Sequence, residues 1–138
     1  MGDYDKFKIK IYNNWDLYLH EQQYPYIGRY YAWAQRDDAA KVTDMTARER
    51  DELFDVVIPA WNNAVAKLFK HDWPNVACLG NTAPHLHWHL IPRYNSPRII
   101  NGIEFTDPNP TGNYAPYPKK TLPLELILEI KKDMKLNL

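Results

Sequence analysis

One short stretch of the chain alternates histidine with apolar residues, and it restricts the local fold more than any other feature of the sequence. It reads His85-Leu86-His87-Trp88-His89-Leu90-Ile91-Pro92-Arg93 and holds three of the five histidines. Successive side chains of a β-strand point to opposite faces, so one face receives the three imidazoles and the other receives Leu86, Trp88 and Leu90. We therefore expect a strand whose apolar face packs against a helix, and which Pro92 ends because proline cannot donate to a ladder.

The residues around this row predict an antiparallel sheet. Strands are expected where charged and apolar residues alternate or where aromatic and branched residues gather, over 7–12, 15–20, 28–35 and 75–80. The segment 21–26 is polar and contains Pro25, which predicts a loop that brings side chains to one end of the sheet.

A long helix should follow the first three strands. Thr46-Ala47-Arg48-Glu49 matches a capping box, in which the threonine hydroxyl and the glutamate carboxylate each bind an amide of the first turn. Apolar residues then recur at helical spacing to about Phe69, so one face of this helix can lie on the sheet. Pro59 should kink it.

The last part of the chain, 96–138, predicts a proline-rich loop and a second amphipathic helix. That helix is expected over 124–134, after Thr121 and Pro123. The stretch 95–120 is long and lacks a strong period, which leaves three alternatives: a functional lid, a dimer arm or a mobile loop.

The length and charge of the chain restrict what it binds. With 138 residues, 45% of them hydrophobic, residues 1–138 are expected to form a single domain. The 17 basic and 17 acidic residues balance, which argues against bulk nucleic acid or a membrane as partner and leaves a small ligand. Cys78 alone cannot form an intrachain disulfide, and neither a signal peptide nor an apolar run of ~20 residues is evident, so we expect a cytoplasmic protein.

Three interpretations of the histidine row compete. In the first, the histidines occupy a solvent-facing side by chance. In the second, they bind zinc, since two histidines at i and i+2 can share one ion. However, His85 and His89 are about 13 Å apart along a strand, so the whole row cannot hold one ion. A metal would need other ligands, and the candidates are His20, His71, Cys78 and carboxylates.

The third interpretation is nucleophilic catalysis. A neutral imidazole, whose intrinsic pKa is about 6.5, attacks phosphorus without a strong base, while neighbouring groups handle protons and charge. The product is a labile phosphoramidate that water cleaves.

These residues resemble the histidine triad (HIT) family, whose signature alternates three histidines with apolar residues. The resemblance covers roughly 15–95 and includes Leu79-Gly80-Asn81 and 24–29; it looks closest to bacterial proteins of the diadenosine polyphosphate hydrolase-like type. It implies an α+β fold, with an antiparallel sheet of about five strands packed against one long helix and with a C-terminal helix. It also implies a homodimer that binds a purine nucleotide.

The resemblance assigns a role to each histidine of the row. His87, the middle one, matches the family's nucleophile and would form a covalent nucleotidyl intermediate. His85 would help to hold the orientation of that ring, and His89 would lie near the phosphate and leaving group as a donor. No metal site and no cofactor are expected, apart from a divalent metal that can accompany the nucleotide. The family members are hydrolases or nucleotidyl transferases, and the alternative for this chain is a protein that senses a nucleotide without cleaving it.

The resemblance also names substrate-binding residues. Asn81 and Thr82 match polar side chains that contact phosphate, and Glu21 or Gln22 lies near the position of a ribose-binding residue. Ordinary solvated turns are the alternative for these loop residues. Many family members carry a fourth histidine where this chain has Arg29. Arginine cannot shuttle a proton, but it gives a permanently charged, forked donor to a phosphate, and we expect it to reach the phosphate that His87 attacks.

Overall fold

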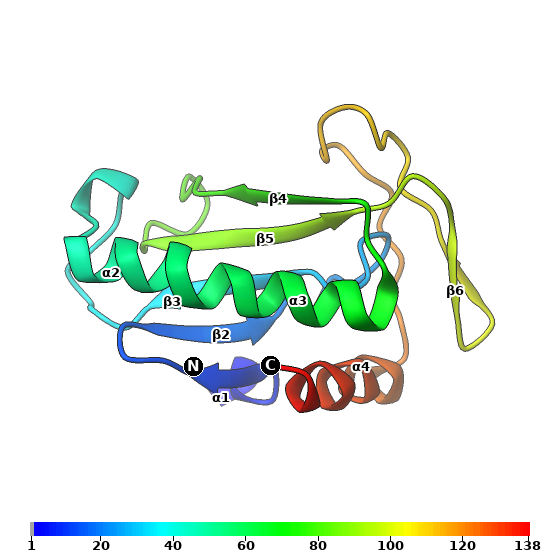
Figure 1. Ribbon diagram of the computed structural model, residues 1–138, viewed down its shortest axis with the longest axis horizontal. Helices are drawn as coiled ribbons and strands as arrows, with labels where there is room; N and C mark the ends of the chain where they lie inside the picture. The colour runs from blue at the N-terminus through cyan, green and yellow to red at the C-terminus, as the bar shows by residue number, and fades with distance from the viewer. Residues whose placement is uncertain (1) are drawn as a thin grey trace.

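An antiparallel sheet of five strands forms the frame of the molecule (Figure 1). The computed structural model describes residues 2–138. The strands are ordered β1-β2-β3-β5-β4, with the bounds β1 Lys8–Ile11, β2 Trp15–Leu19, β3 Tyr30–Ala34, β5 His87–Arg93 and β4 Trp73–Ala77. This sheet, with the helices described below, confirms the predicted α+β fold.

One long helical run crosses a single face of the sheet (Figure 1). It consists of α2 (Ala47–Glu52), the π turn η2 (Leu53–Val57) and α3 (Ile58–Phe69). The capping box is confirmed, because the amide of Glu49 donates to Thr46 Oγ1 at 3.2 Å and the amide of Thr46 donates to Glu49 Oε1 at 2.8 Å. Where we expected a kink at Pro59, the structure has a π turn directly before this residue. In that turn the amide of Ile58 donates to the carbonyl of Leu53.

The core lies between this helix and the apolar face of the sheet. Leu86 and Leu90 are fully buried there, and the ring of Trp88 meets Phe54 edge to face with 5.5 Å between centroids. The predicted packing of the apolar side of the row is thus confirmed. Gly28 has a φ of +92°, and a Cβ at this position would lie 3.1 Å from a methyl of Val65, so helix and sheet approach closely only because this residue is glycine.

Three details of the row and its neighbour differ from the prediction. Strand β5 begins at His87, so His85 precedes it, and β5 continues through Pro92 to Arg93. Pro92 lies opposite Pro74 of β4. The pairing of β5 with β3 ends at Tyr30–Leu90, before Pro92 is reached, so the missing amide of Pro92 breaks no hydrogen bond to β3. Strand β4 occupies Trp73–Ala77 rather than 75–80, and its position at the edge tolerates Pro74.

A hairpin that we did not predict follows β5. Its strands are β6 (Arg98–Ile100) and β7 (Ile103–Phe105). Asn101 and Gly102 between them have φ values of 50° and 76°, as a tight hairpin turn with two left-handed residues requires. The guanidinium of Arg98 donates to the carbonyls of Phe69 and Lys70, so the hairpin is bound to the carboxyl end of α3.

The predicted C-terminal helix is confirmed as α4 (Leu124–Leu136), which lies beside β1 in Figure 1. The two remaining helical segments are short: α1 (Gly2–Asp5) and η1 (Val42–Asp44). Within residues 2–138, no helix combines the length and apolarity needed to cross a membrane.

Candidate active site

The histidine row faces a pocket on the side of the sheet opposite α3. The pairs Trp33–His87 and Tyr31–His89 place rings of β3 directly beside the imidazoles of β5. The pocket, called the histidine pocket below, has a volume of about 270 Å³ and is lined by Tyr4, His20, Tyr31, Trp33, Ala83, His87 and His89. The structure therefore gathers His87 and His89 in one pocket, together with aromatic side chains that we had not assigned to the site.

The imidazole of His87 is held in one tautomer. It is buried, with 7% of its surface exposed, and its Nδ1 lies 2.6 Å from the carbonyl oxygen of His85. A carbonyl oxygen only accepts, so Nδ1 carries a proton, and in the neutral imidazole the lone pair is on Nε2. That lone pair is the group a nucleophile needs.

Two contacts fix His85 although it lies outside the strand. Its Nε2 donates to the carbonyl of Ala34 at 2.6 Å, and its ring stacks on Trp33 with 4.1 Å between centroids and 10° between planes. These contacts hold the residue whose own carbonyl orients His87. The resemblance assigns an orienting role to His85, and the stacked ring of Trp33 helps to hold this residue in position.

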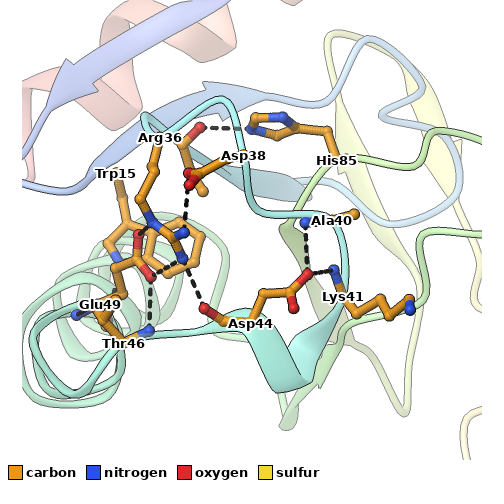
Figure 2. Close-up of polar contacts among 10 residues, drawn as sticks. Trp15, Arg36, Asp38, Ala40, Lys41, Asp44, Thr46, Glu49 and His85 are labelled. Carbon is orange, nitrogen blue, oxygen red and sulfur yellow. Dashed lines mark hydrogen bonds and ion pairs between the residues drawn. The ribbon is translucent and has the colours of Figure 1, made fainter.

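A network around Arg36 supports the segment after β3 (Figure 2). The guanidinium binds the buried carboxylate of Glu49 with two hydrogen bonds of 3.1 and 3.0 Å. It also donates to Asp38 and to the carbonyl of Asp44, so the chain that leaves β3 is joined to the start of α2. In Figure 2, the dashed line from His85 marks its hydrogen bond to the carbonyl of Ala34, the last residue of β3 before this segment.

The imidazoles of His20 and His89, which also line the pocket, are neutral near pH 7. Burial, with smaller contributions from the charges of His87 and Arg29, lowers the pKa of His89 to about 4. Burial also lowers the pKa of His20 well below its usual value, again with help from Arg29. Gln22 donates its amide to His20 Nδ1 at 3.0 Å, which leaves the proton of His20 on Nε2. The rings of His20 and His89 are 6.1 Å apart.

We did not assign His20 to the site from the sequence, although a signal was present. The strand before it pairs Tyr18 with Tyr31 on the pocket face. His20 follows Tyr18 by two residues, so it continues on the same face.

Acidification is expected to destabilise the protein through His89. The pKa of this imidazole is about 4 in the folded chain, compared with an ordinary value of 6.5. Between these values the unfolded chain binds a proton that the folded chain does not, so stability is complete above about pH 6.5 and falls as the pH drops toward 4. We expect His89→Gln to reduce the fall in urea midpoint between about pH 7 and pH 5. An equal fall in variant and wild type would assign the acid sensitivity to other groups.

Arg29 is buried beside the pocket under an aromatic loop. Its side chain lies on the face of Tyr31 and Trp33, and the residue is 3% exposed. Its Nη1 donates to the hydroxyl of Tyr117 at 2.7 Å, and its guanidinium carbon lies 5.7 and 5.3 Å from the ring centroids of Tyr114 and Tyr117.

A buried ion pair holds that loop in place. Arg93 binds Asp107 through two hydrogen bonds of 2.7 and 3.0 Å, and also donates to the carbonyls of Asn109 and Gly112. The part of 95–120 that follows the hairpin is therefore bound to the sheet through Arg93.

The other residues expected to bind substrate lie outside the pocket lining. Asn81 and Thr82 are exposed in the turn before β5, next to Ala83 of the pocket. Glu21 and Gln22 line a neighbouring hollow of about 250 Å³, where Gln22 donates to the carbonyl of Lys120 at 3.3 Å. Within residues 2–138, no three His, Cys, Asp or Glu side chains are arranged to hold a metal ion.

Comparison with known proteins decides the family. The family model of the HIT domain matches residues 11–96, which is more than half of the chain. The chain belongs to the HIT family. HIT proteins bind small nucleotides, and they are generally nucleotide hydrolases or transferases, although some are not catalytic.

Solved HIT structures share the fold at low identity. A histidine triad protein from Sinorhizobium meliloti is 20% identical, with 96% of this chain and 89% of that chain covered and a TM-score of 0.73. A hypothetical histidine triad nucleotide-binding protein from Sulfolobus tokodaii is 15% identical, with 95% and 82% covered and a TM-score of 0.67. A zinc-bound HIT family protein from Mycobacterium smegmatis is also 15% identical, with 99% and 86% covered and a TM-score of 0.65. No curated protein matches the chain.

Proposed function

We propose that this protein is a nucleotide hydrolase or nucleotidyl transferase that acts on a purine nucleotide of the diadenosine polyphosphate type. It cleaves a phosphoanhydride, phosphoester or phosphoramidate bond through a covalent intermediate on His87. The observation that carries the proposal is the hydrogen bond from His87 Nδ1 to the carbonyl of His85, which leaves Nε2 with its lone pair at the histidine pocket.

In the first step, Nε2 of His87 attacks phosphorus and a phosphorus–nitrogen bond forms. The bond from phosphorus to the leaving oxygen or nitrogen breaks, and the leaving group takes a proton from water. Neutral His89 is the proposed hydrogen-bond donor to the leaving group, because its ring lies 5.0 Å from that of His87 on the same face. The positive charge that develops on His87 is stabilised by the carbonyl of His85, which accepts its Nδ1–H.

In the second step, water or another acceptor attacks the phosphorus and the bond to His87 breaks. The attacking hydroxyl gives its proton to the surrounding water, and His87 regains its lone pair on Nε2 as its bond to phosphorus breaks. Asn81 and Thr82, at the rim beside Ala83, are proposed contacts of the phosphate, and Glu21 or Gln22 a proposed contact of the ribose. No cofactor of the protein takes part in this scheme.

Trapping of the intermediate tests this function. The protein is incubated with a panel of radiolabelled adenine nucleotides, with and without a strong chelator, and quenched in acid or alkali. We expect labelled protein that is stable in alkali and labile in acid, in both chelator arms. Complete loss of activity that zinc restores would overturn the metal-free mechanism, a relevant comparison because the HIT protein from Mycobacterium smegmatis is zinc-bound. Nucleotide binding without turnover would identify a nucleotide-sensing protein instead.

We further propose that the protein is a homodimer. The chain has ten tyrosines and five tryptophans, residues that are enriched at interfaces. Two large apolar residues at the edge of the sheet are exposed, with Trp73 67% and Leu79 57% accessible. Light scattering at micromolar concentration should give about twice the chain mass of 16.3 kDa. A species of 16.3 kDa alone would contradict this prediction.

The cytoplasm is the proposed place of action. Cys78 is the one cysteine of the chain, so no intrachain disulfide can form, which fits a reducing compartment.

A further inference from the structure

Two buried arginines on the pocket face of the sheet differ in how their charge is balanced. Arg29 and Arg93 are each 3% exposed. Arg93 binds the carboxylate of Asp107 through two hydrogen bonds. The guanidinium of Arg29 has one hydrogen bond, to the hydroxyl of Tyr117, and its Nε is buried without a partner. Among the side chains of residues 4–138, no carboxylate lies within ion-pair distance of Arg29.

A buried charge without a counter-ion is costly. The tyrosine rings over Arg29 recover part of this cost through cation–π contacts, but the rings carry no net negative charge to balance the guanidinium. An anion that binds beside the guanidinium would supply the missing charge, as Asp107 does for Arg93.

The register of the sheet places Arg29 beyond His89 rather than beside His87. The pairs Trp33–His87 and Tyr31–His89 are successive on the pocket face. Arg29 is the next residue of that face, because it precedes Tyr31 by two positions. Two residues span about 6.5–7 Å of strand, so the base of the arginine lies about 13 Å along the sheet from the level of His87. This is the end of the row at which His89 meets the leaving group in the proposed mechanism.

The groups around Arg29 at this end are suited to negative charge. The amide of His20 donates to the carbonyl of Arg29 at 2.9 Å, so the two residues are neighbours across β2 and β3. The charges of Arg29 and Lys119 both lower the pKa of His20, after the larger effect of burial. His20 carries its remaining proton on Nε2, which makes it a donor.

We propose that Arg29, with His20 and His89, forms an anion subsite for the leaving group of the substrate. The ligand is a phosphate or polyphosphate beyond the phosphorus that His87 attacks. In this state Arg29 exchanges the hydroxyl of Tyr117 for phosphate oxygens, and the loop that carries Tyr117 moves aside. The inference rests on the proposed function and narrows it: substrates whose leaving group is anionic are preferred over phosphoramidates whose leaving group is a neutral amine.

Binding of inorganic tripolyphosphate tests the subsite without any turnover. Calorimetry compares the wild type with Arg29→Met, Arg29→Lys, Tyr117→Phe and Arg48→Met, the last being a matched loss of one exposed positive charge. We expect Arg29→Met to weaken binding roughly 10- to 150-fold, the range for a charge-assisted hydrogen bond. Arg29→Lys should be intermediate, because lysine keeps the charge and loses the fork. Tyr117→Phe and Arg48→Met should stay within about 3-fold of the wild type, since neither removes a proposed anion ligand.

Equal binding by the wild type and Arg29→Met would overturn the proposal and assign Arg29 to a structural role under Tyr117. Arg29→Lys keeps this test valid if the methionine variant fails to fold.

A second measurement uses two substrates with the same nucleoside monophosphate, one with a phosphate leaving group and one with an alkylamine leaving group. Arg29→Met should lower kcat/KM roughly 10- to 150-fold for the first and less than about 3-fold for the second. Equal losses would contradict the subsite. If tripolyphosphate binding depends on Arg29 but no nucleotide is cleaved, the subsite stands and the proposed hydrolase function falls.

Discussion

His87→Asn is expected to abolish turnover, with a fall in kcat of roughly 10⁴-fold or more, while nucleotide affinity stays within about an order of magnitude. Asparagine can still donate to the carbonyl of His85, which holds His87 at 2.6 Å, but it has no imidazole lone pair to attack phosphorus. Binding survives because other groups contact the nucleotide. The measurement pairs single-turnover rates with calorimetric affinities.

His71→Asn serves as the matched control for this variant. His71 lies outside the histidine pocket and contacts Asn62 at 2.6 Å, so its loss should leave kcat unchanged. Wild-type turnover in His87→Asn would show that the mechanism proposed here is wrong.

Asp107→Ala should destabilise the protein by about 3–5 kcal/mol, because it leaves the guanidinium of Arg93 buried without a counter-ion. Asp107 also accepts from the amides of Tyr94 and Asn109, so its loss removes the support of the loop that carries Tyr117. Urea unfolding at constant pH measures the change.

The double variant Arg93→Met/Asp107→Leu separates the two contributions to this effect. Removing both charges eliminates the unpaired ion, so the double variant should recover part of the lost stability. A loss below about 1 kcal/mol in Asp107→Ala would indicate that water reaches Arg93 and that the pair acts as an exposed one.

Local patterns in the chain were sufficient to predict the five strands of the main sheet and the two long helices. The alternation of the histidine row separates an apolar face from a face of imidazoles, and both faces are where the pattern placed them. The capping box at Thr46 and Glu49 marked the start of the long helix to the residue. These features are predictable because each depends on residues within one turn or one strand.

Two other local signals are present in the sequence, but we made no prediction from them. Asn101-Gly102 is typical of a tight hairpin turn, and the hairpin β6–β7 is built on it. The position of His20, two residues after Tyr18, indicated the pocket face in the same way as the row itself did.

The amino-acid pattern alone therefore predicts the strands of the main sheet, the two long helices, the faces on which their residues lie and the histidines of the row that can act together. The groups that support these histidines became visible only in the folded chain. Trp33 stacks on His85, and the hydroxyl of Tyr117 reaches Arg29 across 88 positions of the chain. The carboxylate of Asp107 pairs with Arg93, and the guanidinium of Arg29 has no carboxylate partner among the described side chains. Such pairings depend on strand register and on how a long loop closes over the sheet, and both are set by packing between distant residues rather than by any local pattern.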